Sequence, residues 1–457
     1  MNLLNIYNHL PVFLQNLAVT WQGFLIKRQR YGGNFKKYLS ELEESQWFPI
    51  EKLKEIQWEK FKFMINHAYQ NVPYYRNLFN KIGLSPEDIK NEGDLEKIPI
   101  LEKQVIKDHR DDFIAQNINK KNLIPYTTGG TTGTPLTLFV TKYAIQYNFA
   151  FSEARVKYWA GVKSGDKLAT FLGKVIVPPN VRKSPFWRYN KAYNQLLFSS
   201  FHMNDENLKY YLEKFNQFKP EILQGYVSTI HRFAKYILDY NKKVFCPKAI
   251  LTSSETLFDW QKKDIEKAFG ARVYNSYSLA EYVGFISECE KGGLHISPEY
   301  GLVELKQLAN SNQSEIIATT LFNFAMPLIR YKTRDVVTLS EEKKCPCNRE
   351  LPLVSSIEGR VDGMLITPEG NYISPAAMSL VFQAAKNIKE SQIIQTKKDK
   401  IIVRIAKEKN FGENDLYYLL SQLRERLGKA ININFEFVDK IERTKSGKFR
   451  FIISEIF

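Results

Sequence analysis

Apolar residues recur three and four positions apart along the first hundred residues, most clearly from residue 58 to residue 65. This spacing predicts helices, because it gathers the apolar side chains on one face of a 3.6-residue turn. Only short turns separate these segments, and the mostly helical region ends near Pro99. From about residue 120 to residue 358, short β-branched runs such as 123–126, 249–252 and 314–320 alternate with helical patterns. Such alternation is typical of an α/β domain.

The last part of the chain follows a different pattern. Residues 373–457 have the order helix, strand, helix, strand. Strands are expected at 400–405 and 432–438, and an amphipathic helix is expected at 416–427. The joint with the preceding part is expected near residues 359–362, where a strand-like segment gives way to glycine and charged residues.

Together these patterns predict an α/β protein of two domains. At 457 residues the chain is longer than one hydrophobic core usually supports, which is about 250–300 residues. We expect a large, multi-layer N-terminal domain over residues 1–358, with residues 1–100 mostly helical. A small, mobile α+β lid domain is expected over residues 359–457.

The net charge of the chain restricts the classes of partner that it is expected to bind. Lys and Arg number 65 against 49 Asp and Glu, so the net charge is +16, which favours nucleotide phosphates, acidic sugars, a membrane surface or nucleic acid. The basic residues are scattered and no nucleic-acid recognition module is evident, so we expect no nucleic-acid partner. A basic nucleic-acid-binding or scaffold protein stays open as an alternative class.

Four cysteines do not form a secreted disulfide framework, which favours a reduced, cytoplasmic setting.

The N-terminal segment has two interpretations. Residues 3–26 are apolar but interrupted by asparagine, glutamine, histidine and proline, with no Lys or Arg before them, so they resemble neither a signal peptide nor a spanning helix. One interpretation is a capping helix on the large domain. The other is docking at an anionic membrane surface, because Trp21 and Phe24 precede a basic cluster at residues 27–30. Peripheral membrane association at the inner face is therefore left open.

A loop of glycine and threonine carries the most distinctive chemistry. Residues 126–135 read Tyr-Thr-Thr-Gly-Gly-Thr-Thr-Gly-Thr-Pro after a short strand. Glycines let backbone N–H groups turn inward around an anion, and hydroxyls add donors, so a triphosphate is a suitable ligand. The loop is not a Walker loop, because no lysine follows its last glycine. A plain turn of small residues is the alternative.

Four further segments, one of them residues 359–364 at the expected joint, are weak signals when taken singly. Tyr277 could stack on a base, and Glu281 could hold Mg²⁺, although a core tyrosine and a surface glutamate are equally ordinary. Asp335 is expected at a strand end, where it could accept hydrogen bonds from ribose hydroxyls. Lys448 lies in the polar segment 443–448, which by itself would be read as a solvated turn.

In this order the segments resemble the adenylate-forming ligase superfamily of acyl-CoA synthetases and peptide-synthetase adenylation domains. The sequence is most similar to its phenylacetate-CoA ligase branch and to the capsular polysaccharide biosynthesis proteins of that branch. That similarity rests on residues 71–76 (Asn-Val-Pro-Tyr-Tyr-Arg), the glycine-threonine loop and the segment around Cys289. It spans about residues 55–457.

The resemblance implies a nucleotide site assembled from positions along the whole chain. Its residues would be Thr128, Gly129, Gly130, Thr131, Thr132, Gly133, Glu255, Tyr277, Glu281, Asp335, Arg360 and Lys448. The loop would cradle the phosphates and Tyr277 would stack on adenine. Glu255, with its neighbour Ser254, would border the adenine pocket, and Asp335 would bind the ribose. Arg360 would contact the ribose-phosphate side.

The resemblance also assigns catalysis to Lys448, Glu281 and Thr131. Lys448 would reach both the substrate carboxylate and the α-phosphate, and Mg²⁺ on Glu281 would help to neutralise charge in the transition state. Asp362 would be the hinge about which the C-terminal domain turns after pyrophosphate leaves. Three positions depart from the pattern: Gly129 replaces a serine found in many relatives, Arg334 a glycine and Gly363 a second aspartate. A relative that binds nucleotide without catalysis is therefore a further alternative.

The implied activity is an ATP-dependent, AMP-forming carboxylate ligase. The acid is first converted to an acyl-adenylate, and the acceptor is either an amine on an amino acid or sugar, in surface polysaccharide synthesis, or coenzyme A. We favour the amine. The expected partners are thus a small carboxylic acid and its acceptor, with ATP/AMP, Mg²⁺ and structural Zn²⁺ as cofactors.

Zinc is expected because Cys289, His295, Cys345 and Cys347 supply three sulfurs and one imidazole. A Cys₃His set is a common tetrahedral zinc site. Zinc bound there would fix the segment between residues 296 and 344 to the large domain. Clusters of this kind also occur in relatives of the branch. Reduced cysteines with an unrelated histidine are the alternative. Cys246 stands alone and is expected in the core.

Overall fold

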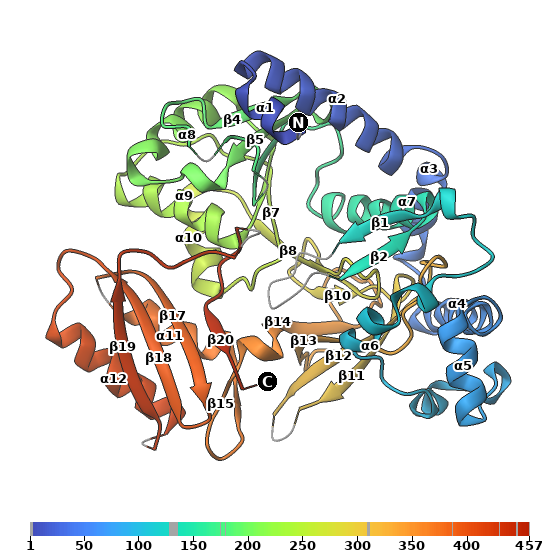
Figure 1. The fold of residues 1–457 in the computed structure, drawn as a ribbon. Coiled ribbons are helices and arrows are strands. Elements are labelled where there is room, and N and C mark those ends of the chain that lie inside the picture. Colours follow the sequence, from blue (N-terminus) through green and yellow to red (C-terminus); the bar gives the residue numbers. More distant parts are fainter. Residues whose placement is uncertain are drawn as a thin grey trace.

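A computed structural model describes residues 3–127, 136–173, 175–178, 180–308, 311–385, 387–428, 430–444 and 447–456 (Figure 1). Among these residues, twelve strands form one mixed sheet in the large domain. Their order is β4 (Trp187–Asn190), β5 (Gln195–Ser199), β3 (Leu168–Leu172), β6 (Ile222–Gly225), β7 (Ala249–Ser253), β8 (Val273–Ser278), β9 (Phe285–Glu288), β10 (Leu294–Ile296), β14 (Leu353–Arg360), β13 (Tyr331–Leu339), β12 (Gln313–Thr320) and β11 (Gly301–Gln307). Strands β5, β3, β6, β7 and β8 run parallel, and the other pairs are antiparallel.

Helices cover both faces of the parallel strands. Along β7, Ala249 and Leu251 belong to one apolar cluster and Ile250 to another, because successive side chains of a strand point to opposite faces. The first cluster includes α3 and α7, and the second includes α8, α9 and α10 (Figure 1). These helices span Phe35–Ser45, Lys142–Phe151, Asp205–Phe218, Val227–Asp239 and Asp259–Phe269, and α7 continues as the π-helix η5 (Ser152–Lys157). The α/β class and the multi-layer large domain expected from the sequence are confirmed.

The helical N-terminal region packs on the antiparallel part of the sheet. Phe61 and Ile65 lie one turn apart on α4 (Ile50–Asn71) and are buried with Ile316 and Val337 of the sheet. Smaller elements follow: α5 (Pro73–Ile82), η1 (Pro86–Asp88), η2 (Glu92–Lys97), α6 (Lys103–Asp108), η3 (Arg110–Phe113), η4 (Lys120–Asn122) and the hairpin β1 (Ile124–Thr127) and β2 (Thr137–Val140). The predicted helical start of the chain is thus confirmed.

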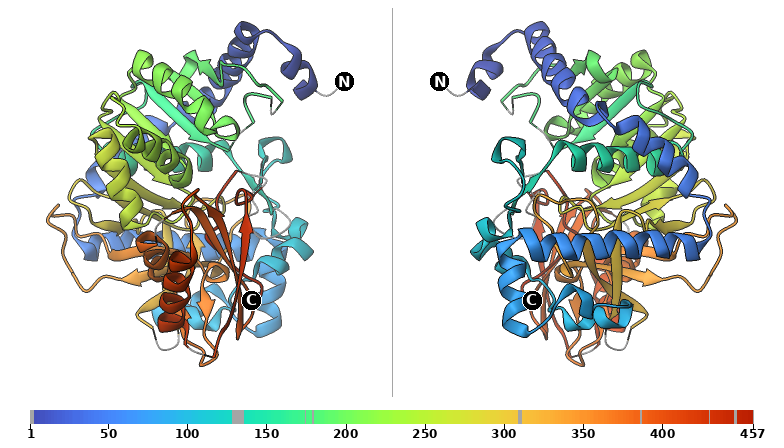
Figure 2. Two further views of the ribbon diagram at one scale, coloured as in Figure 1. Left: turned by 90° about the vertical axis from the view of Figure 1, so that its left-hand side faces the viewer. Right: turned by 90° about the vertical axis from the view of Figure 1, so that its right-hand side faces the viewer.

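Two further helices lie at the outer edge of the large domain. In Figure 2, α1 (Leu3–His9) and α2 (Val12–Tyr31) project at the top of the molecule, and α2 packs on β4 and α7. The 3₁₀ helices η6 (Lys191–Tyr193) and η7 (Ser200–His202) flank β5. Helix α2 therefore caps the β4 edge, as one of its two interpretations predicted.

The C-terminal unit has its own sheet and core. Its strands lie in the order β19 (Asn432–Val438), β18 (Lys400–Lys407), β17 (Ile388–Lys397) and β20 (Ile452–Ser454). Helices α11 (Pro375–Ala384) and α12 (Glu413–Leu427) contribute to the same apolar cluster, and β15 (Leu365–Ile366) pairs with β16 (Tyr372–Ile373). The α+β class is confirmed, but the expected order of helix, strand, helix, strand missed β17 and β20. The polar residues of β17 obscure its pattern, and β20 is only three residues long.

A short segment connects the two units. After β14 the chain forms the 3₁₀ helix η8 (Val361–Gly363), in which the Asp362 carboxylate is buried. It accepts hydrogen bonds from Arg360 Nε at 2.9 Å and from Arg450 Nη2 at 3.2 Å. Asp362 therefore ties the connecting segment to the chain just beyond Lys448.

Candidate functional site

A cavity of about 260 Å³ lies between the large domain and the C-terminal unit. The large domain contributes the loop after β7 and parts of β8, β13 and β14, while the C-terminal unit contributes residues 448–452. Predicted residues that line it are Glu255, Tyr277, Asp335, Arg360 and Lys448. The fold thus brings together five positions that lie far apart in the sequence.

Lys448 follows a glycine that packs on the large domain. Gly447 has φ +77°, a conformation that favours glycine, and a Cβ there would lie 3.1 Å from Gly173 Cα. The Lys448 N–H donates to Thr444 Oγ1 at 3.0 Å. Lys448 Nζ lies 5.8 Å from the ring centre of Tyr226. Burial lowers the pKa of Lys448, and the nearby carboxylates of Glu255 and Asp335 oppose that shift.

Glu255 connects the two sides of the cavity. Its carboxylate accepts the Ser228 N–H at 2.8 Å and the Ser228 hydroxyl at 3.1 Å, in the first turn of α9. On the other side it accepts the Phe449 N–H at 2.7 Å. Burial raises the pKa of Glu255, and these donors oppose the shift. The carboxylate is thus engaged in protein contacts beside Lys448, and its expected place at the border of an adenine pocket stays a prediction.

Tyr277 and Asp335 form a hydrogen-bonded pair on the cavity wall. Tyr277 Oη donates to Asp335 Oδ2 at 2.8 Å, and Asp335 lies opposite Arg360 in the pairing of β13 with β14. Burial raises the pKa of Asp335 to about 6, against the opposing charge of Arg360. The expectation that Asp335 ends a strand is wrong. It lies in the middle of β13, because β13 pairs with β12 along one edge and with β14 along the other.

Glu281 lies behind the cavity wall in the turn between β8 and β9. It is buried, so the surface alternative is wrong, and Tyr331 Oη donates to its Oε1 at 3.3 Å. Burial raises the pKa of Glu281, while the positive charges of Lys103 and Arg360 oppose this shift. Lys103, in the first turn of α6, was missed because no pattern in its surroundings distinguishes it from a surface lysine.

Most of the glycine-threonine loop lies outside the residues that the structure describes. Residues 128–135 lie outside the described residues, and with them the predicted phosphate ligands Thr128, Gly129, Gly130, Thr131, Thr132 and Gly133. Its two ends are held together, since Thr127 pairs with Thr137 in the β1–β2 hairpin. The rings of Tyr126 and Tyr282 are 5.9 Å apart, so the start of the loop lies beside the residue that follows Glu281.

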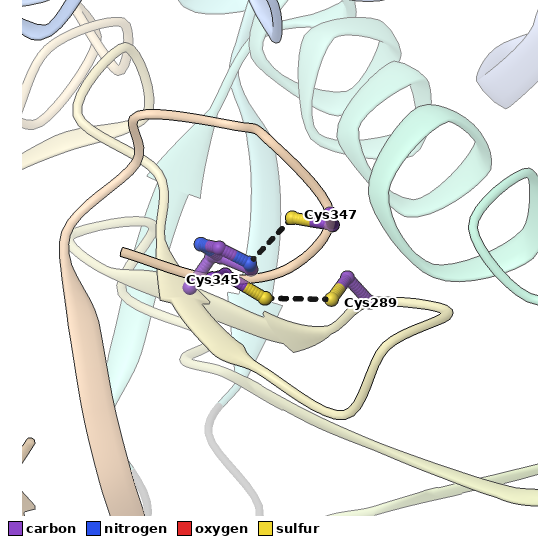
Figure 3. A group of neighbouring side chains, drawn as sticks. Cys289, Cys345 and Cys347 are labelled. Carbon is purple, nitrogen blue, oxygen red and sulfur yellow. Dashed lines mark hydrogen bonds between the residues drawn. The ribbon is translucent and has the colours of Figure 1, made fainter. Parts of the chain in front are cut away.

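A second cluster combines three cysteines and a histidine (Figure 3). Cys289 follows β9, His295 lies in β10, and Cys345 and Cys347 lie in the connection from β13 to β14. All four are buried, and their potential ligand atoms lie within 4.8 Å of one another. Cys289 Sγ is 3.6 Å from Cys345 Sγ, and Cys347 Sγ is 3.4 Å from His295 Nε2.

These distances fit a tetrahedral zinc site. Zn–S bonds of about 2.3 Å and Zn–N bonds of about 2.1 Å place neighbouring ligand atoms roughly 3.5–3.8 Å apart. The other ring nitrogen, His295 Nδ1, lies 3.2 Å from the Leu351 carbonyl oxygen, the arrangement that leaves Nε2 free to bind a metal. At Gly293 an added Cβ would lie 2.6 Å from Cys345 Sγ, so a glycine is needed there.

Cys246, expected in the core, is exposed, because it lies in the irregular segment before β7.

The chain is similar in sequence and in fold to known proteins. Residues 365–455 match the CapK C-terminal domain family. Protein CapK of Staphylococcus aureus is 36% identical over 454 residues, which cover 99% of each chain. A phenylacetate-coenzyme A ligase of Thermus thermophilus is 26% identical over 366 residues, 77% of this chain and 79% of the relative. The solved structure of a 2-hydroxyisobutyryl-CoA ligase with R3-HIB-AMP matches with a TM-score of 0.70 at 20% identity, covering 90% of this chain and 91% of that one.

Proposed function

The chain belongs to the CapK family and is an adenylate-forming ligase, and we propose that it transfers the activated acyl group to an amine. The amine would be carried by an amino acid or a sugar, and the reaction would serve surface polysaccharide synthesis. Reduced thiols and the use of ATP suit a cytoplasmic location.

The observation that supports this assignment most strongly is the presence of Lys448 in one cavity with Tyr277, Asp335 and Arg360. In the first half-reaction an oxygen of the substrate carboxylate forms a bond to the α-phosphorus of ATP, and the bond to the pyrophosphate oxygen breaks. Both reactants are anionic, so a cation at the reacting centre lowers the barrier. Lys448 would supply that cation, while Asp335 would accept hydrogen bonds from the ribose hydroxyls and Tyr277 would lie along the adenine.

Glu281 is suited to hold Mg²⁺ beside this cavity. Its carboxyl is buried with a raised pKa, so a divalent cation there would favour the ionised form. Tyr126, near the end of β1 and just before the glycine-threonine loop, lies next to Tyr282, which supports a triphosphate site on the same side. A magnesium ion bound there would neutralise part of the charge of the phosphates.

Coenzyme A is the less favoured acceptor, because the relatives named as coenzyme A ligases are less similar to this chain than Protein CapK is. Protein CapK matches the whole chain at 36% identity, whereas the phenylacetate-CoA ligases are 24–26% identical over 71–80% of it. The C-terminal unit, which carries Lys448, matches the CapK C-terminal domain family. In the second half-reaction the amine nitrogen would attack the acyl carbon and AMP would leave. Lys448 lines the cavity in this arrangement, so we expect the unit to turn about Asp362 when the acceptor is admitted.

Product analysis tests the proposal. The protein would be incubated with ATP, a panel of uronic and aryl acids, and amino acids, amino sugars or coenzyme A, and the products identified by mass spectrometry. We expect AMP, pyrophosphate and an amide. A thioester without any amide would instead establish the coenzyme A ligase alternative. Lys448→Ala should abolish acid-dependent pyrophosphate release, and Lys440→Ala, which changes an exposed lysine of the same unit, should not.

We also propose that Cys289, His295, Cys345 and Cys347 hold a structural zinc ion. Four protein ligands would leave no open position for substrate, so zinc there would serve the fold and not the chemistry. It would fasten the connection between β13 and β14 to the β9–β10 hairpin. Because β14 leads directly to Arg360 and Asp362, this fastening would also support the cavity wall.

A further inference from the structure

Helix α2 turns its apolar residues away from the protein. Phe13, Leu17, Trp21, Phe24 and Leu25 have side chains that are 51–68% exposed. Their spacing places them on one face of the helix, since residues three and four apart are neighbours on a helical surface. Five large apolar side chains in one exposed stripe are unusual for a surface that contacts only water.

The opposite, polar face of α2 is the one bound to the protein. The Tyr189 N–H donates to Asn16 Oδ1 at 2.9 Å, and the Lys191 N–H donates to Thr20 Oγ1 at 3.1 Å. Lys27 Nζ donates to the Ala192 carbonyl at 2.9 Å. Gln15 is buried and accepts Arg188 Nε at 2.5 Å. These bonds fix the rotation of the helix, so the apolar stripe cannot turn inward without breaking them.

The surroundings of the stripe carry positive charge. Residues 1–40 contain no Asp or Glu but five basic residues, Lys27, Arg28, Arg30, Lys36 and Lys37. Residues 173–191 also lack acidic residues, and Arg182, Lys183 and Lys191 are exposed there. This second segment adjoins the N-terminal helices, because Tyr7 Oη donates to the Ile176 carbonyl at 2.7 Å. Exposed Val175 lies next to that contact.

We propose that α1, α2 and residues 175–178 and 180–191 form a docking surface for an anionic lipid bilayer. A helix of 20 residues is about 30 Å long and could lie in the plane of the headgroups with its apolar stripe inserted. Trp21 suits the boundary between headgroups and acyl chains, and the exposed Arg28, Arg182 and Lys183 would face the lipid phosphates. Among the described residues no helix is long and apolar enough to cross a membrane.

Vesicle sedimentation tests this surface. The full chain should sediment with vesicles of phosphatidylglycerol and phosphatidylcholine, and less with phosphatidylcholine alone or at high salt. Replacing the exposed residues by Phe13→Ser, Leu17→Ser and Trp21→Ser should weaken binding by about tenfold or more. A matched triple variant, Phe63→Ser, Tyr240→Ser and Tyr417→Ser, changes equally exposed rings elsewhere and should bind like the wild type.

A second set of substitutions separates the contribution of charge to vesicle binding from that of apolar contact. Arg28→Gln with Arg182→Gln and Lys183→Gln should remove the preference for phosphatidylglycerol, whereas Lys54→Gln with Lys62→Gln on α4 should not. Wild-type fluorescence should shift to the blue with vesicles, and Trp21→Phe should lose most of that shift. Absence of vesicle binding by the wild type, or equal binding by the α2 triple variant, overturns the proposal. A wild-type dimer that the triple variant dissociates, with no lipid binding, would make the stripe an interface between copies instead.

Discussion

The Glu255 carboxylate accepts the backbone N–H of Phe449 at 2.7 Å, although 194 residues separate the two. The same carboxylate binds Ser228 at the start of α9, so it joins the large domain to the residue next to Lys448. Because the contact is to a backbone N–H, it fixes the position of the chain that presents the lysine. The Glu255–Phe449 bond is therefore the direct link between the domain arrangement and the placement of the Lys448 cation.

Glu255→Gln should weaken this link while keeping the shape of the side chain. The amide has one acceptor oxygen, so its NH₂ group must face either the Ser228 or the Phe449 N–H. We expect carboxylate-dependent ATP–pyrophosphate exchange to fall about tenfold, as expected for about 1.4 kcal/mol lost from one hydrogen bond. Glu350→Gln is the control, because Glu350 accepts the Ile50 N–H at 3.0 Å in an exposed position. Unchanged exchange in Glu255→Gln would show that the link does not position Lys448.

Removing Lys448 should have a larger effect on the first half-reaction. We expect Lys448→Ala to lower ATP–pyrophosphate exchange by about 10²–10³, which corresponds to the loss of roughly 3–4 kcal/mol of transition-state stabilisation. The melting temperature should change little, because the buried ammonium is disfavoured by desolvation and its removal relieves that cost. Wild-type exchange in this variant would refute the role assigned to Lys448.

The affinity for ATP should depend on the ionisation of Asp335. Burial raises the pKa of this carboxyl from 3.8 to about 6, so the ionised form, which would accept the ribose hydroxyls, predominates only above that pH. The KM for ATP should therefore rise as pH falls below about 6, approaching tenfold per pH unit. Asp335→Asn should have a high KM at every pH and no such dependence near pH 6. An identical pH profile in the variant would assign the titration to another group.

The zinc proposal predicts about one zinc per chain in purified protein. Cys345→Ser should lose the metal and lower the melting temperature by roughly 5–10 °C, because three ligands remain without the ion that organises them. Cys246→Ser, at the exposed cysteine outside the cluster, should retain both the metal and the melting temperature. Metal-free protein that melts like the zinc-loaded protein would leave the cluster without a structural role.

The sequence was most informative where chemistry restricts the residue type. Three cysteines and a histidine, spread over residues 289–347, were grouped correctly because those side chains share one ligand chemistry. Lys448, Asp335 and Arg360 were expected in one site because of a resemblance in motif order, and the fold brings them to one cavity. None of these residues could have been placed by local periodicity alone.

Other features depend on packing that no local pattern records. Asp335 lies in mid-strand because β12 and β14 both pair with β13. Strand β17 was missed because its polar residues obscure the apolar pattern expected of a central strand. The outward orientation of the apolar face of α2 follows from hydrogen bonds to residues about 170 positions away. Such long-range partners are set by the tertiary fold.

Asp362 is shared by two guanidinium groups that belong to different sides of the junction. Arg360 adjoins it in sequence and faces the cavity, whereas Arg450 reaches it from the far end of the C-terminal unit. A rotation that carries Arg450 away would break its ion pair with the acid and leave Arg360 in place, so the closed form holds an ion pair that the open form lacks. Since mobile ions weaken such attractions, raising ionic strength should shift the balance between the two forms toward the open state.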